Sequence, residues 1–174
     1  MRIARSKHLH LDSAAVHMYW RCHNKEFYLN SPEAKKLYLE SLERSLKRKS
    51  SYQNSVRINA FCLMGNHCHQ LIDFCNSSTT LSNHMRYSHG IFGAKYNRKN
   101  SRCGKVAMGR PQTSLLQNSE HQMRVHFYIE ANPLRAGLCS LNQLRFFSFN
   151  SYKFFAFGIK DRLSKLLTIP DWYL

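Results

Sequence analysis

Residues 56–74 contain two apolar runs that only the dipeptide Gly65-Asn66 separates. The first run reads VRINAFCLM and the second reads HCHQLIDF. Each run has the length and the β-branched or aromatic content of a strand, and Gly-Asn suits a tight turn between two antiparallel strands. The sequence therefore predicts a β-hairpin here, with two histidines, His67 and His69, inside its second strand.

The hairpin stands within an alternation of strand-like and helix-like segments. Ser31 and Pro32 are suited to the first positions of a helix, Ser119 is a candidate N-cap of a later helix, and Pro133 predicts an end or a kink after Asn132. The order predicts one α+β domain over residues 1–174, a ferredoxin-like antiparallel sheet of about four strands with helices packed on one face and the other face open to a ligand. The predicted strands are 14–22, 56–64, 67–74 and 113–117, and the predicted helices are 31–49, 79–100 and 118–132.

The charge of the chain favours a polyanionic partner. Lys and Arg number 26 against 10 Asp and Glu, which gives a formal charge of +16, and aromatic residues make up 13% of the chain. Such a field recruits nucleic acid, and aromatic rings can stack its bases, although a basic surface can also serve solubility alone. The six cysteines form no C-x-x-C pair, and no stretch is apolar enough for a membrane span, so we expect a soluble, cytoplasmic protein with reduced thiols.

His67 and His69 are expected on the same face of their strand. Side chains alternate along a strand, so the two Cα atoms would be about 6.8 Å apart and both imidazoles could converge on one metal ion. Cys68, Gln70 and Ile72 would then point to the opposite face, towards the helices. A pair of hydrogen-bonded histidines without any metal is the simpler alternative.

Tyr128 and Asn132 are candidates to complete such a site. They are spaced i and i+4 in a predicted helix, about 6 Å apart along its axis and on the same side. The amide could ligate Mg²⁺ or Mn²⁺ with positions left open for phosphate oxygens, and the phenol could attack that phosphate. By itself, Tyr128 could equally be a packing residue.

The two central motifs together resemble those of a known family. FCLMGNHCHQLI, followed about 60 residues later by FYIEANPLRAGL, is similar to the single-tyrosine HUH transposases, above all to the REP-associated tyrosine transposases of bacteria. The segments VHMYWRCHNKEF and FNSYKFF also resemble the family, so the likeness covers roughly residues 10–155 and leaves 156–174 as a C-terminal tail. Two positions and one segment depart from the family pattern: Gly65 replaces a proline, Cys22 replaces a glycine, and VAMGRPQTS lacks a phenylalanine.

The resemblance implies a function and roles for individual residues. His67, His69 and Asn132 would bind Mg²⁺ or Mn²⁺, and Tyr128 would be the nucleophile that cleaves and rejoins single-stranded or REP-like hairpin DNA through a covalent 5′-phosphotyrosine. The protein would act as a monomer or a homodimer. A group of basic residues would contact the DNA backbone: Arg2, Arg5, Lys7, Arg21, Arg86, Lys95, Arg98, Lys99 and Arg110.

Two other functions remain open from the sequence. One is a basic module that binds structured nucleic acid without chemistry, such as a transposase-derived domain. The other is a zinc hydrolase built on the His-x-His pair, for which Asp73 is the nearest acidic residue.

Overall fold

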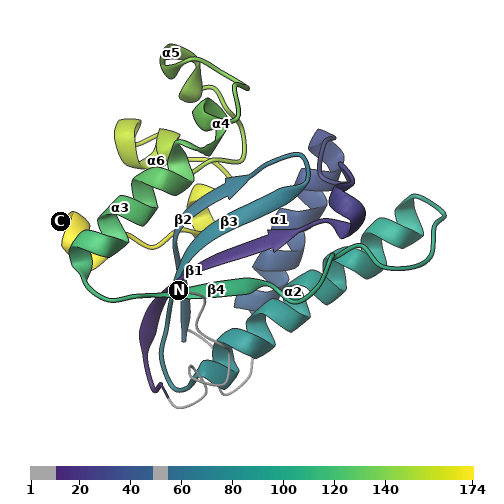
Figure 1. Ribbon diagram of the computed structural model, residues 1–174, viewed down its shortest axis with the longest axis horizontal. Coiled ribbons are helices and arrows are strands. Elements are labelled where there is room, and N and C mark those ends of the chain that lie inside the picture. The colour runs from purple at the N-terminus through teal and green to yellow at the C-terminus, as the bar shows by residue number, and fades with distance from the viewer. Residues whose placement is uncertain (1–10, 49–54) are drawn as a thin grey trace.

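The computed structural model describes residues 11–48 and 55–174 of the 174-residue chain. A four-stranded antiparallel sheet forms its centre, and three longer helices pack against it (Figure 1). The strands are β1 (Ala14–Arg21), β2 (Val56–Leu63), β3 (His67–Phe74) and β4 (Gln112–Leu116), and the longer helices are α1 (Pro32–Leu46), α2 (Ser78–Lys99) and α3 (Ser119–Glu130). The shorter elements are α4 (Asn132–Arg135), α5 (Leu141–Leu144), α6 (Tyr152–Phe157) and the 3₁₀ turns η2 (His23–Lys25), η3 (Ser164–Leu166) and η4 (Asp171–Tyr173).

The strands lie in the order β2-β3-β1-β4, so β1 and β3 are neighbours at the middle of the sheet. The predicted hairpin joins β2 to β3, and the Met64 amide donates to the His67 carbonyl at 2.9 Å across its turn. A Cβ atom at Gly65 would lie 3.0 Å from the Phe27 ring, so that side chain would have to shift to admit a larger residue. The β1–β3 register sets Tyr19 opposite His69 and therefore fixes which side chains share a face.

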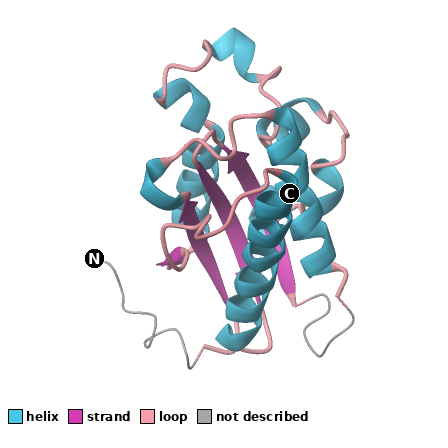
Figure 2. Cartoon of the chain, turned by 90° about the vertical axis from the view of Figure 1, so that its right-hand side faces the viewer, coloured by secondary structure: helices cyan, strands magenta, loops and turns pink. Residues whose placement is uncertain are grey.

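Alternation along β1 divides its side chains between two different surroundings. Val16, Met18 and Trp20 belong to the main apolar core, which they share with side chains of α1 and α2. Figure 2 shows these two helices side by side over that face of the sheet. His17, Tyr19 and Arg21 occupy the alternate positions and face the other way.

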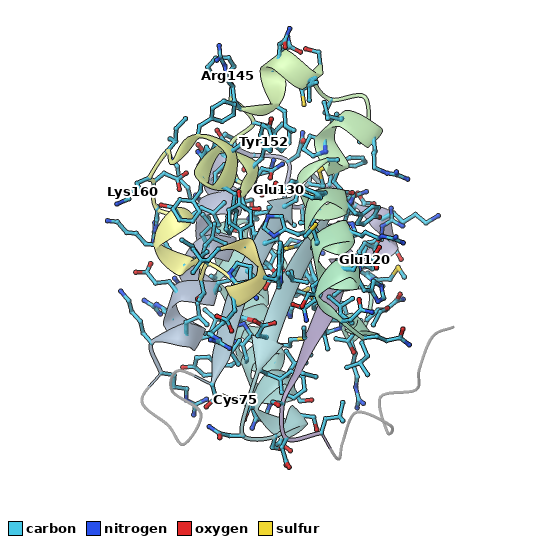
Figure 3. The ribbon with its side chains drawn as sticks, turned by 90° about the vertical axis from the view of Figure 1, so that its left-hand side faces the viewer. Cys75, Glu120, Glu130, Arg145, Tyr152 and Lys160 are labelled. Carbon is cyan, nitrogen blue, oxygen red and sulfur yellow. The ribbon has the colours of Figure 1, made fainter. Side chains whose placement is uncertain are left out.

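The predicted α+β fold class is confirmed, but the second face of the sheet is not left open along its length. Helix α3 lies across β2 and β3 on that face. The reason is a second apolar cluster, in which Ile129 of α3 packs with Ala60, Cys62 and Leu71 of the sheet. Together with the C-terminal residues, α3 covers part of this face (Figure 3).

The helix ends follow short-range signals in the sequence. Ser31 caps α1 as predicted, since its hydroxyl accepts from the Ala34 amide at 3.1 Å. The predicted cap of α3 is wrong by one residue, because Asn118 and not Ser119 accepts from the His121 amide, at 2.8 Å. The break predicted at Pro133 falls at Ala131, between α3 and α4.

The C-terminal part, for which the sequence predicted no structure, folds back onto the outer side of α3. The Trp172 indole donates to Gln122 at 2.9 Å, and the Ser151 hydroxyl donates to Glu130 at 2.8 Å. Asn150 also forms an isolated bridge to Cys62 of β2. These contacts fix the helix that carries Tyr128. Within residues 11–48 and 55–174, no helix has the length and apolar character to cross a membrane.

Candidate active site on the α3 face of the sheet

His67 and His69 lie on the same face of β3, as the alternation predicted. Their ring centroids are 5.2 Å apart and the rings stand at 90° to each other. His69 is only 5% exposed, whereas His67 is half-buried. Cys68 and Ile72 point to the opposite face and join the main core, as expected.

Each histidine is held through its Nδ1 atom. The Asn66 side-chain oxygen lies 2.7 Å from His67 Nδ1, and the Asn66 amide nitrogen donates in turn to the Lys25 carbonyl at 3.1 Å. His69 Nδ1 lies 2.9 Å from Nε2 of His17 on β1. When Nδ1–H donates in both contacts, each ring keeps the lone pair of Nε2 for a ligand. Neighbours of this kind set the tautomer and the orientation of metal-binding histidines.

Burial keeps these imidazoles neutral. It lowers the pKa of His67 to about 4, with a further contribution from the Arg21 charge. It lowers the pKa of His69 to about 3, and His17, His67 and Arg21 add to the effect. Burial and His121 lower the pKa of His17 to about 4. At pH 7 the rings are therefore neutral, which is the form that binds a metal ion.

Tyr128 of α3 packs directly against the histidine cluster. Its ring centroid lies 5.6 Å from that of His69 and 5.8 Å from that of His17, edge-on to both. Tyr128 is 37% exposed, so it is accessible from solvent.

Asn132 lies at the start of α4, one turn beyond Tyr128, and is 8% exposed. Its amide nitrogen donates to the carbonyls of Tyr128 and Ile129, at 2.9 and 3.4 Å. These bonds fix the carboxamide with its oxygen directed away from the two carbonyls. Asn132 thus supplies one oriented amide oxygen at the end of the tyrosine helix.

By chemical type, the side chains of His67, His69 and Asn132 would suit a divalent metal ion with a mixed ligand set. Two neutral Nε2 atoms and an amide oxygen suit Mn²⁺ better than Mg²⁺, which prefers oxygen ligands alone. In the part of the chain that the structure describes, no group of three or more His, Cys, Asp or Glu side chains could hold a metal. A closed site of the structural zinc type is therefore not formed by the described residues.

Four residues of the site were not assigned a role from the sequence: His17, Asn66, Tyr19 and Arg135. The Tyr19 ring centroid lies 4.9 Å from that of His69, and burial is the main cause that raises the pKa of Tyr19. The exposed Arg135 guanidinium lies 5.3 Å from the centre of the Tyr128 ring. His17 and Tyr19 could have been found from the alternation His-x-Tyr-x-Arg in β1, which mirrors His-x-His.

The predicted DNA-binding residues fall into several separate groups. Arg21 lies opposite His67 in the sheet, and its Nε atom finds no hydrogen-bond acceptor among the described residues. Arg86 and Arg110 line a cavity on the other side of β1. Lys95 pairs with Glu40 of α1 at 3.1 Å, so its charge is already balanced within the helical layer. Arg98 and Lys99 are exposed at the end of α2, whereas Arg2, Arg5 and Lys7 lie outside the described residues.

Solved structures identify the class of fold. The architecture matches that of a REP-associated tyrosine transposase bound to a REP hairpin, with a TM-score of 0.68 at 15% identity over 87% of this chain and 85% of that one. A candidate transposase from Deinococcus radiodurans R1 aligns over 75% of this chain and 96% of its own, at 18% identity and a TM-score of 0.43. No protein-family model matches the sequence, and no curated protein matches it significantly.

The chain therefore has an α+β fold of the tyrosine transposase type. At 15% identity the likeness shows the fold alone, and the chemistry depends on the side chains that this chain itself carries.

Proposed function

We propose that this protein is a metal-dependent endonuclease and strand transferase that cleaves and rejoins single-stranded DNA through a 5′-phosphotyrosine on Tyr128. The observation that carries the proposal is the contact between the Tyr128 phenol and the His69 ring, with centroids 5.6 Å apart. A candidate nucleophile is thus in ring contact with one histidine of the candidate metal-binding pair. Nucleophilic catalysis requires this proximity.

His67, His69 and Asn132 would bind the metal ion, whereas Tyr128 would react with the DNA. A divalent metal ion held by Nε2 of His67, Nε2 of His69 and the Asn132 amide oxygen would supply the Lewis acidity that offsets charge on the scissile phosphate. Asn66 and His17 hold the two rings in orientation through their Nδ1 atoms. Burial keeps the pKa of each ring far below 7, so protons do not compete for Nε2 at neutral pH.

Tyr128 would form and later release the covalent bond to DNA. Its phenolic oxygen attacks the phosphorus, a P–O bond to tyrosine forms, and the bond from phosphorus to the 3′-oxygen breaks. The phenol loses its proton, and the departing oxygen gains one to become a 3′-hydroxyl. A second 3′-hydroxyl can attack the phosphotyrosine and restore a phosphodiester, because the linkage retains the energy of the broken bond.

Two guanidinium groups lie next to the residues proposed for cleavage, one near His67 and one over Tyr128. Arg21 faces His67 across the sheet and carries an Nε–H group without an acceptor among the described residues. Arg135 lies exposed over the Tyr128 ring. Both can donate to phosphate oxygens, since guanidinium groups pair well with them. They would position the scissile phosphate beside the phenol.

Hairpin DNA is the substrate that we propose. Support comes from the neighbour with the same fold, which is described as bound to a REP hairpin, and from the formal charge of +16 on this chain. The site is assembled from one chain, which supports a monomer that cleaves with its own tyrosine. A dimer that exchanges α3 would have to carry the C-terminal residues with the helix or break the contacts of Trp172 and Ser151 with it.

A covalent adduct on a gel tests the proposal. The purified protein is incubated with a single-stranded oligonucleotide that carries a hairpin, in the presence of Mn²⁺, and denaturing electrophoresis is used to look for a slower band. We expect the band with the wild type and with Tyr19→Phe, which keeps the second phenol's ring, and no band with Tyr128→Phe. A folded wild type that binds the hairpin without any adduct would favour the non-catalytic binding module instead.

A further inference from the structure

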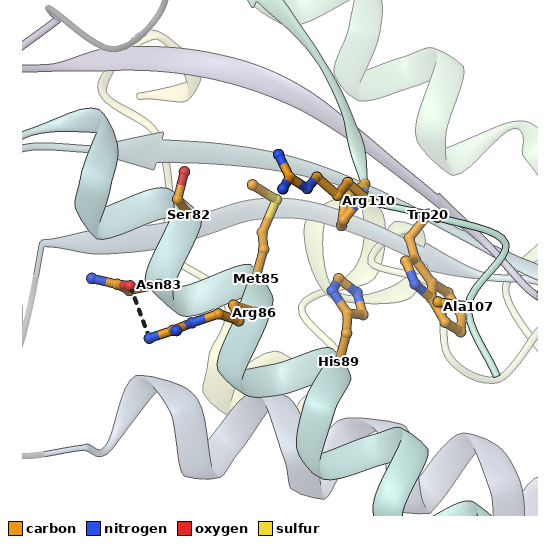
Figure 4. A pocket seen from close by; sticks show the side chains of 10 residues that line it. Trp20, Ser82, Asn83, Met85, Arg86, His89, Ala107 and Arg110 are labelled. Atoms are coloured by element: carbon orange, nitrogen blue, oxygen red, sulfur yellow. Dashed lines mark hydrogen bonds between the residues drawn. The ribbon is translucent and has the colours of Figure 1, made fainter. Parts of the chain in front are cut away.

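A cavity of about 550 Å³ opens on the side of β1 opposite the histidine cluster (Figure 4). It is bounded by Trp20 of β1, Met85, Arg86 and His89 of α2, and Arg110 and Pro111 of the segment before β4. Its volume lies within the range of sites for small ligands. Neither the histidine pair nor Tyr128 takes part in it, so this space is separate from the candidate active site.

The cavity exists because the chain leaves the sheet edge just before β4. The Met108 amide donates to the Arg21 carbonyl at 2.9 Å, and Gln112 pairs again with Tyr19. Between these two points, Gly109, Arg110 and Pro111 bow away from the strand. Proline has no amide hydrogen with which to continue the ladder. The edge of the sheet beside Trp20 is thereby opened.

One wall of the cavity holds an unpaired polar group. Trp20 is 1% exposed, and its indole Nε1–H has no hydrogen-bond acceptor within the described residues. Leaving a buried donor unpaired is unfavourable, so such groups are commonly satisfied by a bound partner. The ring itself is fixed, because it stacks on His89 with centroids 5.0 Å apart and planes inclined by 8°.

The rim of the cavity is positively charged. Arg86 and Arg110 are both exposed and both line the space (Figure 4). Among residues 11–48 and 55–174, Arg86 makes one long hydrogen bond, 3.4 Å, to the side-chain oxygen of Asn83. The rest of the wall combines the apolar residues Met85, Ala107 and Pro111 with the polar residues Ser82, Asn83 and His89. A flat, largely apolar ligand with acceptor atoms and an attached anion fits this combination.

We propose that the cavity binds one unpaired nucleobase of the DNA strand, with the Trp20 Nε1–H group donating to an acceptor on the base and Arg86 and Arg110 contacting the adjoining phosphates. This inference rests on the proposed function, in which DNA is the partner. Every nucleobase offers an acceptor, whereas a simple inorganic anion would leave the apolar walls unused. Base contacts confer selectivity and phosphate contacts confer register.

The position of the cavity relative to the histidine cluster indicates what a bound base would do. Trp20 stands between Tyr19 and Arg21, whose side chains face the histidine cluster on the other side of β1. A strand that leaves Tyr128 and passes around the sheet edge by Arg110 would reach the cavity. A base held there would fix which phosphate lies beside the Tyr128 phenol, so the cavity would select the cleavage position.

Photocrosslinking tests the location of the base. Twelve-nucleotide dT strands, each with a single 5-iodouracil at a different position, are irradiated with the protein, and the crosslinked peptides are identified by mass spectrometry. We expect at least one position to crosslink to the peptides that contain Trp20, Met85 or His89. The Arg86→Gln, Arg110→Gln double variant should no longer give that crosslink. Crosslinks confined to other parts of the protein would overturn the proposal.

Binding measurements test the hydrogen bond and the charges. Trp20→Phe keeps an aromatic ring but lacks the N–H group, so we expect about tenfold weaker binding of dT₁₂, equivalent to about 1.4 kcal/mol. Trp172→Phe removes the other tryptophan, which is held by Gln122, and should bind like the wild type. The double arginine variant should lower the salt slope by about 0.7 for each phosphate that it no longer neutralises. Unchanged affinity in folded Trp20→Phe, confirmed by circular dichroism, would contradict the proposal.

If the base-binding inference is wrong, the experiments give a different result than if the catalytic proposal is wrong. Tyr128→Phe should retain the crosslink to the cavity while it forms no covalent adduct. A wild type that forms the adduct but no cavity crosslink refutes only the base-binding inference. A cavity crosslink without any adduct refutes only the chemistry and leaves the base-binding inference standing.

Discussion

The two faces of β1 each bring histidines against aromatic rings, but the surroundings of the rings differ. On the α3 face, His17 and His69 meet the half-exposed Tyr128. On the α1–α2 face, His84 Nδ1 lies 2.9 Å from the Ser45 hydroxyl and His89 Nε2 lies 2.9 Å from the Tyr38 hydroxyl. His69 on one face and His84 on the other are both buried, so burial alone does not distinguish a reactive histidine from a packing one.

The pKa values lead to the same conclusion. Burial lowers the pKa of His84 to about 4 and that of His89 to about 3, values similar to those of His67 and His69. What separates the two sets is the phenol beside each: Tyr128, next to His17 and His69, is 37% exposed, whereas Tyr38, next to His89, is fully buried. A perturbed histidine therefore becomes a functional candidate only when a reactive partner is beside it.

The largest expected effect is on the α3 face. His69→Ala removes one of the two proposed imidazole ligands and should slow adduct formation on the order of a thousandfold, the equivalent of about 4 kcal/mol of charge stabilisation. Quenched-flow or manual time courses with a hairpin oligonucleotide measure the rate. Oligonucleotide affinity, followed by fluorescence anisotropy, should change little. A rate within about threefold of the wild type would remove His69 from the site.

A smaller effect is expected when only the orientation of His69 is disturbed. His17→Phe keeps a ring beside Tyr128 but removes the contact to His69 Nδ1, so the Mn²⁺ concentration for half-maximal adduct formation should rise about 10- to 100-fold. Saturating Mn²⁺ should restore most of the rate. His84→Asn on the opposite face is the matched control and should leave the Mn²⁺ requirement unaltered. Equal Mn²⁺ dependence of His17→Phe and wild type would deny His17 a positioning role.

The smallest effect concerns stability and belongs to the α1–α2 face. Because the pKa of His84 is lowered to about 4 in the folded state, the unfolded chain binds more protons as the pH falls from 6.5 towards 4, and stability falls with it. His84→Asn, which can still bond Ser45, should lose about 1.5 kcal/mol less than the wild type between pH 6.5 and 5. Urea titrations at the two pH values give the difference. Parallel losses in both proteins would show that His84 does not carry the acid sensitivity.

Those features that depend on neighbouring residues could be predicted from the sequence. The Gly65-Asn66 turn, the Ser31 cap and the shared face of His67 and His69 all follow from short-range geometry, and the structure bears them out. The cap of α3 was missed by one residue because Asn118 and Ser119 are both good capping residues.

Features that depend on pairing between distant segments could not be predicted. The contact of His17 with His69 requires that β1 lies beside β3 in one particular register, which neither segment specifies alone. The cover of the second face by α3 depends on Ile129 finding Leu71 and Ala60 across the fold. The C-terminal residues are rich in aromatics but show no helical or strand period. No local sequence pattern therefore predicts that Trp172 packs back against Gln122 of α3.

Peptide mapping of the covalent adduct tests the central claim most directly. The wild-type adduct formed on a hairpin oligonucleotide in Mn²⁺ is digested with nuclease and protease, and mass spectrometry locates the residual nucleotide. The account predicts a nucleotide on Tyr128 and none on Tyr19, which is the other phenol beside His69. A nucleotide on Tyr19 or on any other residue would contradict it.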